Sequence, residues 1–396
     1  MGGLDNSNQH IRLWHKDFWK LNLVNFFLAM SVYMQFPVFA NWMAESDMLY
    51  DIQVSVVVGI YGIGLFLFGS VCSYLMQRYR RNKVCVLSMM AIYVVLFCVA
   101  YLKDNLAEDS LFIRWAFFLA CIMRFLMGAF FGLACMILNS TLIVDCCESS
   151  QRTFANIVAT WSYRLAIAIG LLLSVFLLYE TSVAYTMYVS SFLCVLSVGI
   201  LSSVSFPFKA PEETFRIFSL DRFFMRDGMP VVWPLFLVSV YLGILLLNHY
   251  GLLNYSFLTA GVIFAILFQL FTDGKKQMVI NLKLGYVLLL VSAFFLFATS
   301  EYVTCFYAFF LGIGVSMVTT YFHRCFTDVA GHCQRGTAQS TYILIFELGV
   351  SFGAALSLLP CMKSEILLSV TAISVLCISV FIYLLYTSKW LKLRMF

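Results

Sequence analysis

Three ionisable side chains interrupt long apolar stretches of this sequence: Arg124, Arg164 and Glu347. A charged group costs about 2.5–3.5 kcal/mol at the centre of a membrane helix, so such residues almost always face a partner or a water-filled cavity. Burial favours a neutral carboxyl group and a nearby arginine favours an ionised one, so Glu347 is predicted to exchange a proton. Two cations against one acid leave a surplus positive charge, which predicts that Arg124 and Arg164 bind an anionic or strongly polar solute.

The positions of Arg164 and Glu347 correspond in a repeat that relates the two halves of the chain, with an offset of 183 residues. In each half an arginine precedes the midplane residue by twelve positions, or about 18 Å along a helix, which predicts that both charges lie near the middle of the membrane. The repeated residues are Asp145, Arg152, Ala155 and Gly170 in the first half, and Asp328, Arg335, Ala338 and Gly353 in the second.

The composition predicts a membrane protein. Of the 396 residues 62% are hydrophobic and 11% are charged, so the chain has too little polar surface to coat a soluble fold. The apolar segments are long and lack the alternation of barrel strands, which predicts membrane helices of about 20 residues each. We expect an all-α membrane protein with twelve transmembrane helices in two pseudo-symmetric six-helix bundles. The expected divisions are an N-terminal bundle at 1–204, a cytoplasmic linker at 205–229 and a C-terminal bundle at 230–396.

The distribution of lysine and arginine predicts the orientation. If both termini are cytoplasmic, most basic residues fall on inner loops and the outer loops hold mainly acids, which is the positive-inside pattern. The polar start of the chain lacks a cleavable signal pattern, so the first span is expected to be retained. The inner basic positions include Arg12, Lys16, Arg78, Arg81, Lys83, Lys275, Lys276, Lys389 and Lys392, and the outer acids include Glu45, Asp47, Asp104 and Asp109.

The first inner loop carries a motif. It reads SYLMQRYRRNKV, which resembles the G-x-x-x-D-R-x-G-R-R-K loop between the second and third helices of the major facilitator superfamily. Arg78, Arg81 and Lys83 match, and Arg124 with Gly128 resembles the family's R-x-x-x-G helix. Together with the expected spans, linker and repeat, the resemblance covers essentially the whole chain. It implies the major facilitator fold and a secondary transporter, not an enzyme, in which two bundles rock about a central site.

The resemblance also suggests site residues. In this family the first, fourth, seventh and tenth helices usually line the cavity, so Asn25, Tyr33 and Tyr241 join Arg124 and Arg164 as candidate substrate-binding residues. Asn25 is equally consistent with a hydrogen bond between helices, which membrane bundles use in packing. The candidate residue for proton coupling is Glu347, and the candidate inner-gate residues are Arg78, Arg81, Asp145, Arg152, Asp328 and Arg335.

Two departures from the family pattern limit what it implies. Gln77 replaces the aspartate that is thought to hold the inner gate, so that latch is neutral here or built differently. The fifth span lacks the G-x-x-x-G-P-x-x-G-G run of many proton-driven drug exporters. This disfavours a proton-driven multidrug exporter, which remains the alternative function.

Other interpretations compete with a charged transport cavity. Arg164 and Glu347 can pair directly and merely hold one conformation. His323 and Asp328 form an H-x-x-x-x-D pattern like that of membrane acyltransferases, but the companion motifs are absent and Asp328 already belongs to the repeat. A non-transporting receptor would not need buried charges in both halves, and no phosphate-binding glycine loop indicates an ATP-driven pump.

The expected partners follow from this interpretation. They are a small-molecule substrate, protons or sodium ions in their place, and the lipid bilayer. No cysteine spacing indicates zinc, and the basic residues are spread over loop ends, so we expect no cofactor, metal or nucleic acid. We expect a monomer in a bacterial inner membrane, where it acts as a symporter. The sequence leaves the identity of the solute and the direction of transport open.

Overall fold

The computed structural model describes most of the chain, and every helix and turn reported below lies in those residues. The described residues are 14–38, 42, 51–105, 110–148, 151–206, 223–247, 251–272, 275–297, 300–331 and 334–395. Within them all regular elements are helical, and twelve helices are long and apolar enough to cross a membrane. The predicted all-α class and the twelve predicted spans are thereby confirmed.

Six long helices come from the first half of the chain. The fourth of them does not end at a loop but continues through one π-helical turn, η1, into the short α6. The bounds are α1 (Lys16–Tyr33), α3 (Asp51–Arg78), α4 (Arg81–Asn105), α5 (Ser110–Ile137), η1 (Leu138–Leu142), α6 (Ile143–Asp145), α7 (Arg152–Glu180) and α8 (Val183–Ser202).

The second half also contributes six long helices, but here the π-helical turn, η4, lies in the last of them and not in the fourth. A 3₁₀ turn, η2 (Arg226–Gly228), leads into α9, and Pro230 occupies the first turn of that helix, where its missing N–H has no intrahelical partner to lose. The bounds are α9 (Met229–Leu246), α10 (Leu252–Phe271), α11 (Lys275–Phe295), α12 (Glu301–Val329), α13 (Arg335–Ser357), η3 (Pro360–Lys363), α14 (Glu365–Ile382), η4 (Tyr383–Thr387) and α15 (Ser388–Met395).

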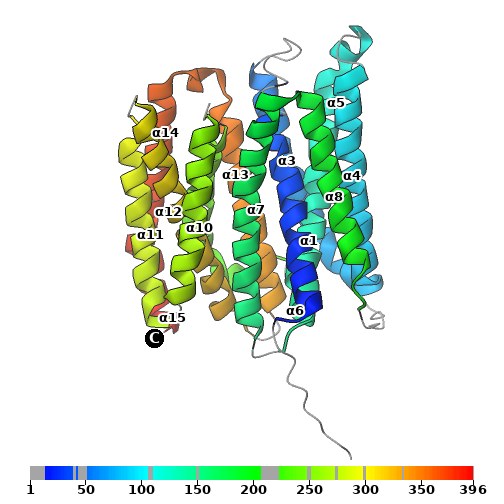
Figure 1. The fold of residues 1–396 in the computed structure, drawn as a ribbon. Helices are drawn as coiled ribbons and strands as arrows, with labels where there is room; N and C mark the ends of the chain where they lie inside the picture. Colours follow the sequence, from blue (N-terminus) through cyan, green and yellow to red (C-terminus); the bar gives the residue numbers. More distant parts are fainter. Residues whose placement is uncertain are drawn as a thin grey trace, which may run out of the picture.

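The helices of each half gather on one side of the molecule (Figure 1). In the first half α3 packs on α5, and α8 packs on α1 and α4; in the second half α9 packs on α13, and α12 packs on α10 and α11. The halves meet along two lines, α3 against α13 and α7 against α10 and α12. Arg164 on α7 and Glu347 on α13 therefore lie on the helices that form the interface.

Small residues allow the closest helix crossings. A Cβ atom added at Gly128 of α5 would overlap the carbonyl oxygen of Tyr61 on α3, and one added at Gly353 of α13 would overlap that of Val240 on α9. Such close backbone approach at glycine is how membrane helices pack without a hydrophobic driving force between them. These crossings fix the rotation of α3 and α13, and so decide which of their side chains face the interface.

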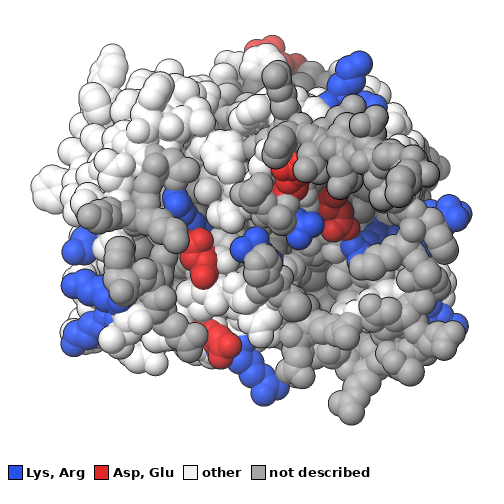
Figure 2. Space-filling model, turned by 90° about the horizontal axis from the view of Figure 1, so that it is seen from below, with Lys and Arg blue, Asp and Glu red and all other residues white. Residues whose placement is uncertain are grey.

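The ends of α3, α6, α7 and α13 that carry the predicted inner-gate residues lie on one face of the bundle, called the inner face here. Basic side chains are spread over this face with acidic ones among them (Figure 2). Most of the predicted linker, including Phe215 and Phe218 of its predicted amphipathic helix, lies outside the described residues. Its end is described: Phe223 is buried, and its ring packs edge-on against Phe66 of α3 at 5.7 Å.

Candidate functional site

Glu347 lies at the centre of the interface between the halves and is completely buried. Its carboxylate accepts hydrogen bonds from three tyrosines on three helices of the first half. Tyr33 of α1 donates to Oε1 at 2.7 Å, Tyr61 of α3 donates to Oε2 at 3.2 Å, and Tyr163 of α7 also donates to Oε1. Because hydrogen bonds to an ionised acceptor are the stronger kind, this cluster joins α13 to three helices of the opposite half. We call Glu347 and these three tyrosines the tyrosine latch.

Arg124 lies beside the latch on α5 and is 2% exposed. Its guanidinium carbon is 4.9 Å from the ring centre of Phe36 and 5.3 Å from that of Tyr61. Aromatic faces attract cations, most strongly where water is excluded. Tyr61 therefore connects Arg124 to Glu347, with its ring on the cation and its hydroxyl on the acid.

Arg164 of α7 lies on the other side of the latch and is 3% exposed. Its guanidinium carbon is 3.5 Å from the ring centre of Phe346, and its Nη2 donates to the hydroxyl of Tyr342. Its Nε and Nη1 find no hydrogen-bond acceptor among the described residues. A buried donor without an acceptor is rare in folded proteins and has an explanation when it occurs.

Arg164 and Glu347 do not pair directly in this state. No nitrogen of Arg164 lies within 4.0 Å of a Glu347 oxygen, the limit for an ion pair. The residues between them are aromatic: Tyr163 binds Glu347, while Phe346 and Tyr342 hold Arg164. This conformation therefore does not contain the direct salt bridge between Arg164 and Glu347 that the alternative interpretation predicts.

Contacts between the halves lie on both sides of the charged cluster. Towards the outer face Ser55 of α3 donates to the carbonyl of Ala355 on α13 at 2.6 Å. Towards the inner face Trp161 of α7 donates to Gln269 of α10 at 2.5 Å. Both hydrogen bonds join the first half to the second.

A second buried polar cluster lies on the inner side of Arg164. His323 of α12 is completely buried, with Nε2 hydrogen-bonded to Gln339 of α13 and Nδ1 3.2 Å from the hydroxyl of Thr160 on α7. The ring of Tyr342 lies against that of His323, with centres 4.6 Å apart. His323 thus touches both helices that carry the midplane charges, α7 and α13.

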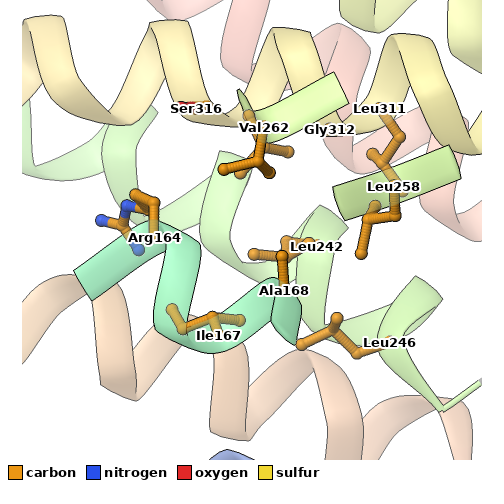
Figure 3. Close-up of a pocket in the computed structure, with 11 residues that line it drawn as sticks. Arg164, Ile167, Ala168, Leu242, Leu246, Leu258, Val262, Leu311, Gly312 and Ser316 are labelled. Atoms are coloured by element: carbon orange, nitrogen blue, oxygen red, sulfur yellow. The ribbon is translucent and has the colours of Figure 1, made fainter. Parts of the chain in front are cut away.

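A small cavity lies next to Arg164 between α7, α9, α10 and α12 (Figure 3). Its volume is about 30 Å³, whereas sites that hold small molecules typically span about 300–1,000 Å³. The cavity lies at the interface between the halves, because α7 belongs to the first half and the other three helices to the second. Opening of the interface would enlarge it.

The remaining predicted substrate ligands have partners away from the latch. Asn25 donates to the carbonyl of Ala159 on α7 at 3.0 Å and accepts from Asn139 at 3.0 Å. It therefore makes hydrogen bonds between helices, as the alternative interpretation of this residue predicts. Tyr241 lies 3.3 Å from the hydroxyl of Ser292, within the second half. Their role towards a substrate stays a prediction.

The inner-gate candidates are brought together in part. Arg81 and Asp145 form an ion pair at 2.6 Å that joins the start of α4 to the end of α6. Arg78 donates to Tyr74 on its own helix. Asp328 pairs with Arg324, one turn earlier on α12, at 3.7 Å, while Arg152 and Arg335 are the first residues of α7 and α13.

Sequence reasoning missed the aromatic residues that organise this site: Tyr61, Tyr163, Tyr342 and Phe346. Their positions held a weak signal, because Tyr163 precedes Arg164 and Phe346 precedes Glu347 in the sequence. A tyrosine in the middle of an apolar helix also needs a partner for its hydroxyl. With 21 tyrosines and 40 phenylalanines in the chain, this signal does not distinguish site residues from packing residues.

Comparisons with known proteins agree with this architecture. The sequence model described as the Major Facilitator Superfamily matches residues 21–272, more than half of the chain. A crystal structure of the nucleoside transporter NupG, solved as a point mutant, is similar over 92% of this chain and 99% of that one, with a TM-score of 0.63 and 10% sequence identity. No curated protein sequence matches this one. At this identity the structural likeness shows the fold alone.

Proposed function

Because the chain belongs to the major facilitator superfamily, whose members are transporters and not enzymes, we propose that this secondary transporter moves a small polar organic solute with an anionic group. We further propose that transport follows alternating access and is coupled to protons. The observation that carries the proposal is the tyrosine latch, in which one buried acid of the second half accepts hydrogen bonds from three helices of the first.

The latch offers a way to couple a proton to movement of the halves. An ionised Glu347 accepts all three hydroxyl bonds in the closed state. Protonation would replace these charge-assisted bonds by weaker neutral ones, and the acid's own O–H would need an acceptor where three donors now point. Proton binding therefore loosens the contact between halves, and release of the proton restores it. By linkage, a conformation that separates the halves binds the proton more tightly.

The two arginines supply the attraction for an anion. Arg124 and Arg164 are both buried, and Glu347 is the acid that shares the cluster with them. Arg164 keeps two donors without an acceptor among the described residues, and an anionic solute would accept hydrogen bonds from them in a medium where a charge without compensation is costly. The aromatic rings that now cover the arginines would move aside for the solute.

The proposal includes the arrangement predicted from the sequence. The moving bodies are the bundles at 1–204 and 230–396, joined by the linker at 205–229. The inner face is cytoplasmic, as the spread of lysine and arginine indicates, and the protein works as a monomer in a bacterial inner membrane. As a symporter it would carry proton and solute in the same direction.

Uptake into reconstituted vesicles tests the coupling. With an inward proton gradient the wild type should concentrate the solute, and Glu347→Gln should lose this accumulation by more than about tenfold, a change in free energy of about 1.4 kcal/mol. Exchange of labelled for unlabelled solute without a gradient should persist in the variant, because exchange needs no net proton movement. Accumulation driven by a sodium gradient at constant pH would instead assign sodium as the coupling ion.

The solute class is tested by thermal shift of the purified protein against sugars, sugar acids, nucleosides, peptides and lipophilic cations, because a ligand of the folded state raises its apparent stability. We expect shifts from anionic solutes and none from lipophilic cations. Arg124→Gln and Arg164→Gln should each reduce transport of the solute identified, measured at several pH values. Full activity in both variants would refute anion binding.

A further inference from the structure

The cavity beside Arg164 has an uneven lining. Two of the side chains that line it are polar, Arg164 and Ser316, and the others are aliphatic or absent. Figure 3 shows Arg164 at one end of the cavity and Leu246, Leu258 and Leu311 at the other. The surface of the cavity is therefore almost wholly apolar, and the side chains of Arg164 and Ser316 lie at one end of it.

Both polar side chains have atoms without a hydrogen-bond partner among the described residues. Arg164 is 3% exposed and leaves Nε and Nη1 without an acceptor; Ser316 is 1% exposed and leaves its hydroxyl without a partner. They lie on α7 and α12, on opposite sides of the interface between the halves. An anionic group bound at this end would accept hydrogen bonds from both residues, and so from both halves.

The rest of the cavity does not suit water. A buried water needs two to four polar partners, and cavities lined by aliphatic side chains stay dry. The aliphatic walls come from Leu242 on α9, Leu258 and Val262 on α10, and Ile167 on α7. An apolar group placed among these side chains would gain the free energy of leaving water at no loss of hydrogen bonds.

We infer that the solute is an amphipathic organic anion, with a carboxylate-like head at Arg164 and Ser316 and an aliphatic or aromatic body against Leu242, Leu258 and Val262. This inference rests on the proposed function and narrows its anionic organic solute to one with an apolar body. The cavity of about 30 Å³ is too small for such a body. Separation of α7 from α10 and α12 would open room for the body.

Binding to the purified protein tests this inference independently of transport. The probes are butanoate, hexanoate and octanoate, benzoate and phenylpropanoate, and the uncharged amide of each, with affinity measured by thermal shift. Affinity for the carboxylates should rise about fourfold for each methylene group that becomes buried, equivalent to about 0.8 kcal/mol, until the cavity is filled. Each amide should bind at least about tenfold more weakly than its carboxylate. Equal affinity across the carboxylate series, or equal binding of acid and amide, overturns the inference.

Variants of the cavity sharpen the test. Leu242→Ala enlarges the apolar end, so the chain length that binds best should increase. Leu235→Ala is the matched control, because Leu235 is equally buried on α9 but does not line the cavity; its preferred chain length should stay that of the wild type. Arg164→Gln should remove the preference for acid over amide and keep the dependence on chain length. An unchanged length preference in Leu242→Ala contradicts the assigned position of the body.

The wild-type series needs no variant to fold, and it separates this inference from the proposed function. Carboxylates that bind with the expected length dependence but are not moved by a proton gradient would contradict proton-coupled transport and support the inference. Proton-coupled transport of a sugar acid, without binding of this carboxylate series, would support the proposed function and contradict the inference. Affinity that stops rising at hexanoate identifies a short aqueous solute; affinity that still rises at octanoate identifies a membrane fatty acid.

Discussion

Glu347 and Arg164 occupy equivalent positions of the internal repeat, but their surroundings differ. Glu347 accepts three hydroxyl hydrogen bonds, all from the opposite half. Arg164 donates one, lies flat against Phe346, and keeps two nitrogen atoms without an acceptor among the described residues. Both oxygens of the acid are therefore hydrogen-bonded, whereas two of the three nitrogens of the cation are not bonded within the described residues.

The difference indicates that the two residues have different functions in transport. The acid, with both oxygens hydrogen-bonded, holds the halves together and would bind a proton. The cation, with N–H groups that lack acceptors among the described residues, would bind a solute. Arg124 resembles Arg164 in its aromatic surroundings, since it lies over Phe36 and Tyr61, so both cations belong to the ligand side of this division. If this division holds, substitutions at equivalent positions of the two halves should have different effects.

The largest expected effect is a difference in the free energy of unfolding between variants of Glu347 and of Arg164. Glu347→Gln should lower the free energy of unfolding by about 3 kcal/mol, because removing one member of a buried charge cluster leaves Arg164 without the negative charge that compensates it. Arg164→Gln should stay within about 1 kcal/mol of the wild type, because the loss of one hydrogen bond is offset by no longer burying unpaired N–H groups. Reversible unfolding in mixed detergent micelles measures both values.

The double variant carrying Glu347→Gln and Arg164→Gln provides the control. If the acid stabilises the fold partly by compensating Arg164, the double variant should be more stable than the sum of the single effects predicts. Equal losses in the two single variants would mean that acid and cation contribute alike, and the proposed division would fail.

The repeated glycines should give the next largest difference. At Gly353 an added Cβ would overlap the backbone oxygen of Val240, whereas at the equivalent Gly170 it would lie 3.1 Å from the oxygen of Met30. Gly353→Ala should therefore destabilise by about 1–3 kcal/mol. Gly170→Ala should be nearly neutral, because the helix gains from alanine offset the tighter contact. The same unfolding assay measures both; similar losses would show that the second-half crossing is not the tighter one.

How far the sequence predicts this molecule depends on which interactions are local. The spans follow from hydropathy and length, and the depth of Arg164 and Glu347 follows from their twelve-residue distance to Arg152 and Arg335, which begin α7 and α13. These are properties of single helices. The repeat adds the pairing of halves, which is why the fold and the central position of the charges were predictable.

The partners of these charges were not predictable, because they depend on how each helix is rotated about its axis. A direct pair between Arg164 and Glu347 was a reasonable expectation from depth alone. Packing of α13 on α3 brings Tyr61 to the acid instead, and packing at Gly128 fixes that rotation. Neither the three hydroxyls on Glu347 nor the rings on the arginines leave a pattern in the sequence that distinguishes them from core residues.

Removal of one latch donor should have a moderate effect on pH dependence. Tyr33→Phe deletes the 2.7 Å hydrogen bond to Glu347 and leaves the ring. A carboxylate with fewer donors is less stabilised relative to its acid form, so the midpoint of the pH profile of uptake should move to higher pH by about one unit. Arg164, Tyr61 and Tyr163 still face the acid and limit the shift.

The matched control for Tyr33→Phe is Tyr286→Phe, because Tyr286 is also buried and its hydroxyl faces Ser379 instead of the acid. The control should keep the wild-type midpoint. A common shift in both variants, or no shift in Tyr33→Phe, would mean that Glu347 does not set the pH dependence of uptake.

The smallest expected effect lies at another pair of repeated positions. Asp145 joins α6 to α4 through Arg81, whereas Asp328 pairs within α12 at a longer distance. The Asp145 pair is partly exposed, so it contributes at most about 1 kcal/mol to the contact of α4 with α6 at the inner face. Asp145→Asn should raise hydrogen exchange at the inner ends of α4 and α6 by at most about fivefold, and Asp328→Asn should change it less.

About 1 M salt screens exposed charges, so it should raise exchange in the wild type and leave Asp145→Asn unaffected. A salt response that survives in Asp145→Asn would assign the contact between α4 and α6 to other charges.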